Sequence, residues 1–277
     1  MNEFDILVSK VLEQNSNLIV LQTVVEKELL HHDILRIMNE NNFLSKLTFI
    51  GGTCLRMCYG SERLSEDLDF SSDFDFSKDS LSKLGGVLCA EFNKKYNLPV
   101  TVTEPKKEEG NTDTWKIKLI TKPEKPDFPS QKINIDICHL PSHDRKIRIP
   151  NNYYGINLGT DDLLLYAESM EEILCDKLIA FVNRPNRVKN RDLWDIFWLK
   201  RKNIEKNENL LEQKLADRKI SLSDYKEKFQ NRIEQIKTEQ EAFLNEMKRF
   251  LFPESFTKNF ISPLWWEYLL GLLSELE

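Results

Sequence analysis

The sequence contains few of the residues that build disulfide-rich or zinc-binding proteins. Its five cysteines are an odd number and include no Cys-x-x-Cys pair, which argues against a disulfide framework and for a reducing compartment. The histidines lack zinc-ligand spacing; they are His31, His32, His139 and His143. A metal other than a carboxylate-bound divalent ion is therefore not expected, and we expect a cytoplasmic protein.

Long hydrophobic runs and targeting signals are also missing. No apolar run approaches the roughly 20 residues of a membrane span, and the acidic N-terminus lacks the basic and apolar regions of a signal peptide. Hydrophobic residues still make up 40% of the chain, enough for a core, while the net charge is −6. This composition predicts a soluble protein with no membrane partner, and it does not favour broad affinity for nucleic acids.

Hydrophobic periodicity predicts a mixed α/β (α+β) protein in two parts. Helices are expected at 2–42, 53–59 and 78–96, and strands at 46–52, 67–72, 98–104, 114–121, 131–139 and 146–150. From residue 161 onward no strand is expected, and the predicted helices are 161–183, 190–201, 208–217, 221–250 and 262–276. We therefore divide the chain into an α/β domain, residues 1–155, and a helical domain, residues 156–277.

A glycine turn follows the first predicted strand. The apolar run at 47–50 leads into Gly51 and Gly52, where the missing Cβ atoms let the backbone approach a ligand closely. A short helix starting at Thr53 would present free N–H groups to a phosphate. The turn is thus a predicted phosphate-binding element.

Three acidic residues lie on predicted strands after this turn. In a strand, Asp67 and Asp69 project from one face and their apolar neighbours from the other. Asp136 alternates in the same way with the isoleucines of 132–138. Two-metal phosphoryl transfer uses about three carboxylates to hold ions roughly 3.5–4 Å apart, so these acids predict a two-Mg²⁺ site, with Mn²⁺ as the alternative. Turn-forming or solvated acids are the simpler alternative.

Four motifs, spread over about residues 45–200, resemble those of the AbiEii/AbiGii abortive-infection toxins. The first is Gly51-Gly52-Thr53 followed by Arg63-x-Ser65-x-Asp67-Leu68-Asp69-Phe70. The others are 132–136 with Asp136, 171–178 with Lys177, and Arg191-Asp192-x-x-Asp195. The resemblance implies a polymerase-β-like nucleotidyltransferase domain followed by a helical domain that closes the cleft, in a toxin restrained by a cognate antitoxin.

The resemblance also assigns roles to individual residues. It implies catalytic roles for Asp67, Asp69, Asp136, Lys177, Asp192 and Asp195, and substrate contacts from Gly51, Gly52, Thr53, Arg63, Ser65 and Lys177. Lys177 would neutralise a triphosphate, while Asp192 and Asp195 share a helix face and would orient Lys177 or the acceptor.

Structural alternatives stay open at several of these positions. Lys177 could be a solvated lysine, and the two helix aspartates could pair with Arg191 or Lys189. Arg63 suits either a carboxylate or a phosphate. Ser65 is more typical of a turn residue than of a nucleophile, because no base is assigned near it.

Local basic clusters qualify the acidic net charge. They are Lys106-Lys107, Lys116 with Lys118, and the group Arg184, Arg187, Lys189 and Arg191. A solvated face is the usual explanation of such clusters, but the last group lies between the third and fourth motifs.

The combined prediction is an Mg²⁺-dependent nucleotidyltransferase. It would transfer a nucleoside monophosphate from an NTP to an RNA acceptor such as tRNA, and an antitoxin would be its protein partner. The alternatives are a small-molecule nucleotidyltransferase of the antibiotic-modifying type and a non-catalytic NTP-binding module.

Overall fold

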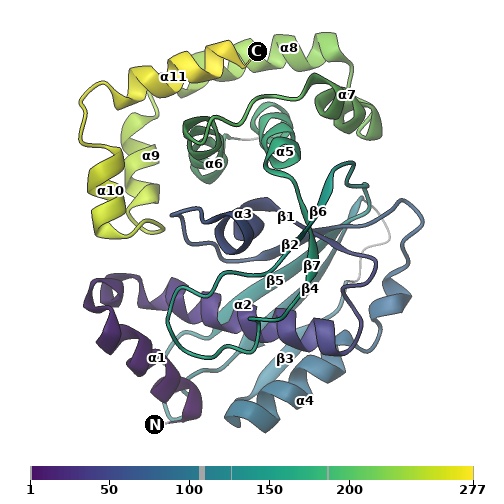
Figure 1. Cartoon of the computed structure of the whole chain (residues 1–277), viewed down its shortest axis with the longest axis vertical. Helices are drawn as coiled ribbons and strands as arrows, with labels where there is room; N and C mark the ends of the chain where they lie inside the picture. The colour runs from purple at the N-terminus through teal and green to yellow at the C-terminus, as the bar shows by residue number, and fades with distance from the viewer. Residues whose placement is uncertain (1, 106–109, 126, 186, 277) are drawn as a thin grey trace.

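The computed structural model places a mixed sheet between two groups of helices, and it describes residues 2–105, 110–125, 127–185 and 187–276 (Figure 1). The predicted basic pair Lys106-Lys107 lies outside the described residues. The strands are β1 (Thr48–Ile50), β2 (Leu68–Ser71), β3 (Val100–Thr103), β4 (Thr112–Leu119), β5 (Gln131–Cys138), β6 (Arg145–Arg148) and β7 (Leu165–Glu168).

The helices fall into an early and a late group. The early ones are α1 (Glu3–Gln14), η1 (Ser16–Leu21), α2 (Gln22–Glu40), α3 (Gly51–Tyr59), η2 (Lys78–Leu81) and α4 (Leu84–Tyr96). The late ones are α5 (Met170–Asn183), α6 (Asn190–Arg201), α7 (Glu208–Asp217), α8 (Leu222–Ile236), α9 (Gln240–Met247), α10 (Pro253–Asn259) and α11 (Trp265–Glu275).

The sheet has the strand order β3-β4-β5-β2-β1-β7-β6. β2 pairs in parallel with β5 and antiparallel with β1, while β7 pairs in parallel with β1. The other neighbours are antiparallel. The predicted mixed α/β class is therefore confirmed.

The helices are distributed over the two faces of this sheet. Figure 1 shows α1, α2 and α4 against one face, and α3 with the late helices on the other. The predicted alternation is present in the central strands: Leu68 and Phe70 of β2 are buried, whereas Asp69 between them is partly exposed. In β5 the three isoleucines are fully buried and Asp136 is partly exposed. The alternation therefore leaves both aspartates on the sheet face opposite their buried apolar neighbours.

The expectation that no strand follows residue 161 is wrong. Residues 165–168 form β7, which pairs with β1 inside the sheet. Helix α5 begins at Met170 rather than at 161, because the Ser169 side chain accepts a hydrogen bond from the Glu172 amide and caps the helix. The sheet thus takes a strand from beyond residue 155, and the division at 155/156 remains a proposal about domains.

The predicted helix 221–250 is also corrected, because it consists of α8 and α9. The Lys237 carbonyl at the end of α8 accepts a hydrogen bond from Trp266 Nε1 at 3.2 Å, so a side chain rather than the next helical turn satisfies this acceptor. The sequence pattern does not predict α10, which begins with Pro253 in its first turn, where proline is tolerated.

Candidate active site

Asp69 and Asp136 are neighbours in the register between β2 and β5. Thr114 lies opposite Asp136 on β4 and donates its hydroxyl to Asp136 Oδ1 at 2.5 Å. Burial and the charge of Asp136 raise the pKa of Asp69 to about 6. Burial also raises the pKa of Asp136, and the charge of Asp67 adds to this shift. The fold thus holds mutually repelling carboxylates side by side.

Asp67 lies immediately before β2, and not within the strand as predicted. Its Oδ1 accepts a hydrogen bond from the Asn134 amide of β5 at 3.0 Å. Its backbone carbonyl accepts one from the Thr53 hydroxyl, on α3. These two contacts fix Asp67 between β5 and α3. The second also means that the Thr53 hydroxyl is already hydrogen-bonded within the protein.

The glycine turn starts α3 two residues earlier than predicted, at Gly51. Gly51 has φ +76°, and a Cβ atom there would lie 2.8 Å from Asp69 Oδ2. Both the left-handed backbone and the close carboxylate therefore require glycine. The first N–H groups of a helix have no intrahelical partner, and at the N-terminus of α3 no cap side chain accepts from them.

Gly52 meets a protein group instead of open space. A Cβ atom at this position would collide with Nη2 of the Arg63 side chain and would lie 3.3 Å from Ser65 Oγ. Arg63 and Ser65 are therefore placed against the turn, but Arg63 does not pair with Asp67 or Asp69: its charge partner is Asp195.

Replacing Gly52 by valine should lower the free energy of unfolding by about 2–3 kcal/mol, because the branched side chain must displace the buried Arg63 guanidinium. NTP binding should weaken as the turn shifts. Gly86→Ala is the matched control, since no atom lies within 4 Å of a Cβ there and a helical position gains stability from alanine. Chemical unfolding and calorimetric NTP titration measure both effects. A Gly52→Val protein as stable as the wild type would contradict the contact.

A buried ion cluster lies behind the turn. Arg63 binds Asp195 with two hydrogen bonds of 2.9 Å, from Nε to Oδ1 and from Nη2 to Oδ2. Lys177 Nζ lies 2.8 Å from both Asp192 Oδ1 and Asp195 Oδ2. Arg184 pairs with the other oxygen of Asp192 at 2.8 Å. The alternative in which the aspartates pair with Arg191 or Lys189 is therefore wrong.

The cluster keeps Lys177 charged beside Asp69. Burial alone would lower the pKa of Lys177, but Asp192 and Asp195 raise it above its usual value. In the same way Lys177 and Arg184 overcome burial and lower the pKa of Asp192 to about 2. Lys177 in turn acts against the upward shift of the Asp69 pKa. The fourth motif thus holds the third-motif lysine close to the carboxylates, as an ion-paired residue rather than a solvated one.

Comparison with known families decides which family the chain belongs to. The family described as "Nucleotidyl transferase AbiEii toxin, Type IV TA system" matches residues 33–268. This chain belongs to the AbiEii family. The AbiEii protein is accordingly a nucleotidyltransferase toxin of a type IV toxin–antitoxin system, which implies an NTP substrate and an antitoxin partner. The resemblance found in the sequence motifs is confirmed.

Solved structures support the fold. MenT4, a nucleotidyltransferase toxin from Mycobacterium tuberculosis H37Rv, aligns with a TM-score of 0.62 at 14% identity, covering 98% of this chain and 90% of MenT4. JHP933 from Helicobacter pylori aligns with a TM-score of 0.50 at 18% identity, covering 92% of each chain. No curated protein sequence matches the chain. Within the described residues, no helix combines the length and hydrophobicity of a membrane-crossing segment.

The carboxylates of the AbiEii protein suit a hard divalent cation in charge and donor type. Asp69 and Asp136 repel each other, and a cation between them would relieve that repulsion. The described residues contain no group of three or more Asp, Glu, His or Cys side chains already arranged around a metal position. Asp67 Oδ1 accepts the Asn134 amide, and its second oxygen is the freer donor for a cation.

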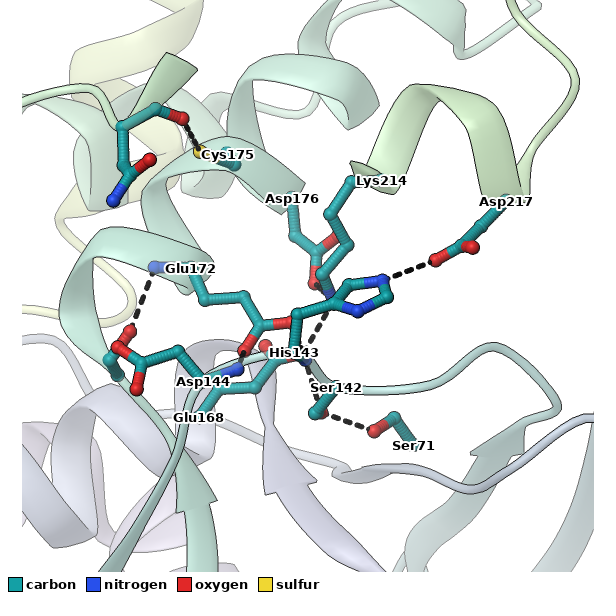
Figure 2. Close-up of polar contacts among 12 residues, drawn as sticks. Ser71, Ser142, His143, Asp144, Glu168, Glu172, Cys175, Asp176, Lys214 and Asp217 are labelled. Carbon is teal, nitrogen blue, oxygen red and sulfur yellow. Dashed lines mark hydrogen bonds and ion pairs between the residues drawn. The ribbon is translucent and has the colours of Figure 1, made fainter. Parts of the chain in front are cut away.

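A second buried cluster fixes the helix that carries Lys177 (Figure 2). The fully buried Lys214 of α7 points between three carboxylates: Glu168 of β7 at 2.7 Å, Glu172 of α5 at 2.8 Å and Asp176 of α5 at 3.0 Å. Asp176 immediately precedes Lys177 in α5. Lys214 therefore ties α5 to the sheet and to α7, and the sequence motifs did not reveal it.

The sequence motifs also missed smaller parts of the site. Thr114 and Asn134 contact the aspartates through the sheet register, which the sequence alone does not supply. Lys189 was noted as part of a basic cluster and as a possible partner of Asp192 and Asp195, not as a neighbour of the strand carboxylates. Its side chain is exposed, yet its charge acts on the carboxyls of both Asp69 and Asp136. Its place between the third and fourth motifs was the one feature of the sequence that could have indicated a role in the site.

Proposed function

We propose that the AbiEii protein transfers a nucleoside monophosphate from an NTP to a hydroxyl of an RNA acceptor in the cytoplasm, in a reaction that requires Mg²⁺. The observation that carries this proposal is the register pair Asp69 and Asp136, with raised pKa values and the Lys177 ammonium near Asp69. This arrangement joins carboxylate donors to a fixed cation on one face of the sheet.

The carboxylates would hold the metal. Asp69 and Asp136, with the second oxygen of Asp67, are the proposed ligands, and Mn²⁺ could replace Mg²⁺ in the same oxygen set. When bound, the ions supply Lewis acidity and orient the phosphates. The proposal is a site for two ions, and calorimetric titration with Mg²⁺ counts them.

The glycine turn and Lys177 would seat the triphosphate. The uncapped N–H groups at the start of α3 suit phosphate oxygens, and Lys177 would neutralise the charge that develops on the leaving pyrophosphate. Asp192 and Asp195 position this lysine, and Arg63 with Ser65 supports the turn from behind. In this proposal no side chain of Arg63, Ser65 or Thr53 touches the substrate. These side chains hold the backbone of the glycine turn, which contacts the phosphates.

Asp136 would assist the acceptor. The acceptor oxygen forms a bond to the α-phosphorus, the bond between that phosphorus and the α–β bridging oxygen breaks, and pyrophosphate leaves. The acceptor proton would pass to the Asp136 carboxylate, which acts as the general base.

Replacing Lys177 by methionine should have two separable effects. Stability should fall by about 2–3 kcal/mol, because the variant leaves buried carboxylates short of a cation. NTP affinity should fall on the order of 10-fold, because the charge near the triphosphate is lost. Adding Asp192→Asn should restore part of the stability and none of the affinity. Asp192 is the better rescue site, because its remaining partner Arg184 is partly exposed, whereas Asp195 holds the buried Arg63.

Melting curves and calorimetric NTP titrations distinguish these effects. A destabilised Lys177→Met protein that binds NTP normally would remove Lys177 from the substrate site and leave it a structural residue.

Label transfer identifies the acceptor. The protein is incubated with each of the four α-labelled NTPs and a cell extract, and the products are divided between ribonuclease, protease and ultrafiltration. We expect one NTP to label material that ribonuclease destroys. Label in the small-molecule filtrate would instead support an antibiotic-type acceptor. NTP binding without any transfer would support the non-catalytic module.

A further inference from the structure

A polar cavity of about 400 Å³ lies next to the candidate active site. The segment before α6 and the start of α6 form one wall, and α8 with α9 forms the other. Its charged lining residues are Arg187, Lys189, Arg191, Arg232, Glu239 and Glu246. This volume falls within the range of small-ligand sites, about 300–1,000 Å³, so one nucleotide unit would fit.

The cations of this cavity are only partly neutralised. Arg191 pairs with Glu66 at 3.2 Å and with Glu246 at 3.4 Å, so its charge is balanced. Arg232 donates to the backbone carbonyls of Val182, at 3.4 Å, and Arg184, which orients its guanidinium without cancelling its charge.

Two further cations are exposed. Arg187 and Lys189 form no ion pair within the described residues. Desolvation lowers the pKa of Lys189, and the nearby charge of Arg184 adds to this shift. Against the unbalanced cations stands only Glu239 on the cavity wall. This excess is local, since the whole chain carries −6, and it favours an anionic ligand.

The position of the cavity points to the acceptor rather than to the NTP. Arg191 on its wall pairs with Glu66, which immediately precedes Asp67, at 3.2 Å. Lys177, the proposed triphosphate partner, is held by Asp192 and Asp195 and does not line the cavity. Attacking and leaving oxygens lie in line on opposite sides of the transferred phosphorus, so a cavity that includes neither Lys177 nor the glycine turn suits the acceptor.

We propose that this cavity binds the phosphodiester backbone of the RNA acceptor strand, next to the end that carries the attacking hydroxyl; the inference rests on the proposed function. Arg187 and Arg232 would contact phosphate oxygens through their guanidinium groups, and Lys189 would bridge the cavity and the carboxylates. A single strand suits the site, because phosphate contacts need no particular base sequence.

The test compares two charge-matched double variants. Arg187→Gln with Arg232→Gln removes the two cavity arginines proposed to contact phosphate. Lys10→Gln with Lys226→Gln removes two exposed lysines that do not line it. A short fluorescein-labelled single-stranded RNA is titrated by anisotropy at several salt concentrations, and NTP is titrated by calorimetry.

The cavity variant should bind RNA on the order of 10-fold more weakly, and its slope of log K against log salt should be smaller by about 1.4, or about 0.7 per lost phosphate contact. The control should bind RNA like the wild type, and both variants should bind NTP normally. Unchanged RNA affinity, a loss of NTP affinity in the cavity variant, or preferential binding of a polyglutamate peptide would each overturn the proposal.

Label transfer by the wild-type protein separates the two possible failures. If the wild type labels RNA while the cavity variant keeps full RNA affinity, the cavity assignment alone is overturned. If the wild type labels no RNA, the proposed function fails and the inference fails with it.

Discussion

Replacing Asp69 by asparagine should reduce nucleotide transfer by roughly 10³-fold or more and, at neutral pH, make the protein more stable. The loss follows from the removal of a carboxylate that would hold the metal and stabilise the charge of the transition state. The gain follows from the removal of a charge that the folded protein disfavours. Few substitutions combine these two effects, so the pair is a sharp test of the site.

The sign of the stability effect follows from the raised pKa of Asp69. In the folded protein this carboxyl has a pKa of about 6, compared with 3.8 for an ordinary aspartate, so it keeps its proton to a higher pH. Between these values the folded state binds more protons than the unfolded state, so stability falls as the pH rises through this window. At pH 7 the ionised group costs about 1–2 kcal/mol, after allowance for its partial exposure.

Urea unfolding at pH 7 and near pH 4 measures this difference. Asp69→Asn should raise the free energy of unfolding at pH 7 and change it little at pH 4. The exposed Asp73→Asn is the matched control and should change neither stability nor transfer. Mg²⁺ should raise the melting temperature of the wild type more than that of Asp69→Asn. An Asp69→Asn protein that is destabilised at pH 7, or that keeps wild-type activity, would contradict the carboxylate assignment.

Replacing Lys214 by methionine should lower the free energy of unfolding by about 3–5 kcal/mol, the largest stability effect expected here. Lys214 is buried against Glu168, Glu172 and Asp176, and its loss leaves buried carboxylates facing one another. Because these carboxylates lie on β7 and α5, the loss of Lys214 should also displace Lys177 on α5. Turnover should therefore fall.

Denaturant unfolding of three proteins tests this expectation. Lys226→Met, at an exposed position of α8, is the control and should change stability by less than about 0.5 kcal/mol. Lys214→Met combined with Glu168→Gln should recover part of the loss, because removing both partners is milder than stranding one. A loss below about 1 kcal/mol in the single variant would show that the cluster contributes little to holding α5.

The sequence supplies the strands of the site but not their partners. Alternation in β2 and β5 predicts which faces Asp69 and Asp136 occupy, because the two-residue period of a strand depends only on the local sequence. The contact between Arg63 and Asp195 joins residues 132 positions apart, and only the packing of α6 against the turn creates it. The reason for glycine at position 52 is the nearby Arg63 guanidinium, and this contact also depends on packing that the sequence does not show.

The missed strand β7 has a local explanation. Residues 163–166 form a continuous apolar run without alternation, which is compatible with a helix or a buried strand. The capping pattern of Ser169 and Glu172 marks where α5 begins and would have separated the two elements. Lys214 had no such signal, because a lysine on a polar helix is usually solvated, and its burial depends on three acids from two other elements.

The most direct test of the central claim compares α- and γ-labelled NTP in the wild type and in Asp69→Asn, with RNA and Mg²⁺ present. The account predicts that α-label enters RNA and γ-label appears in pyrophosphate in equal amounts, and that Asp69→Asn does neither while remaining folded. Transfer of γ-label to the acceptor, or undiminished α-label transfer by Asp69→Asn, would contradict it.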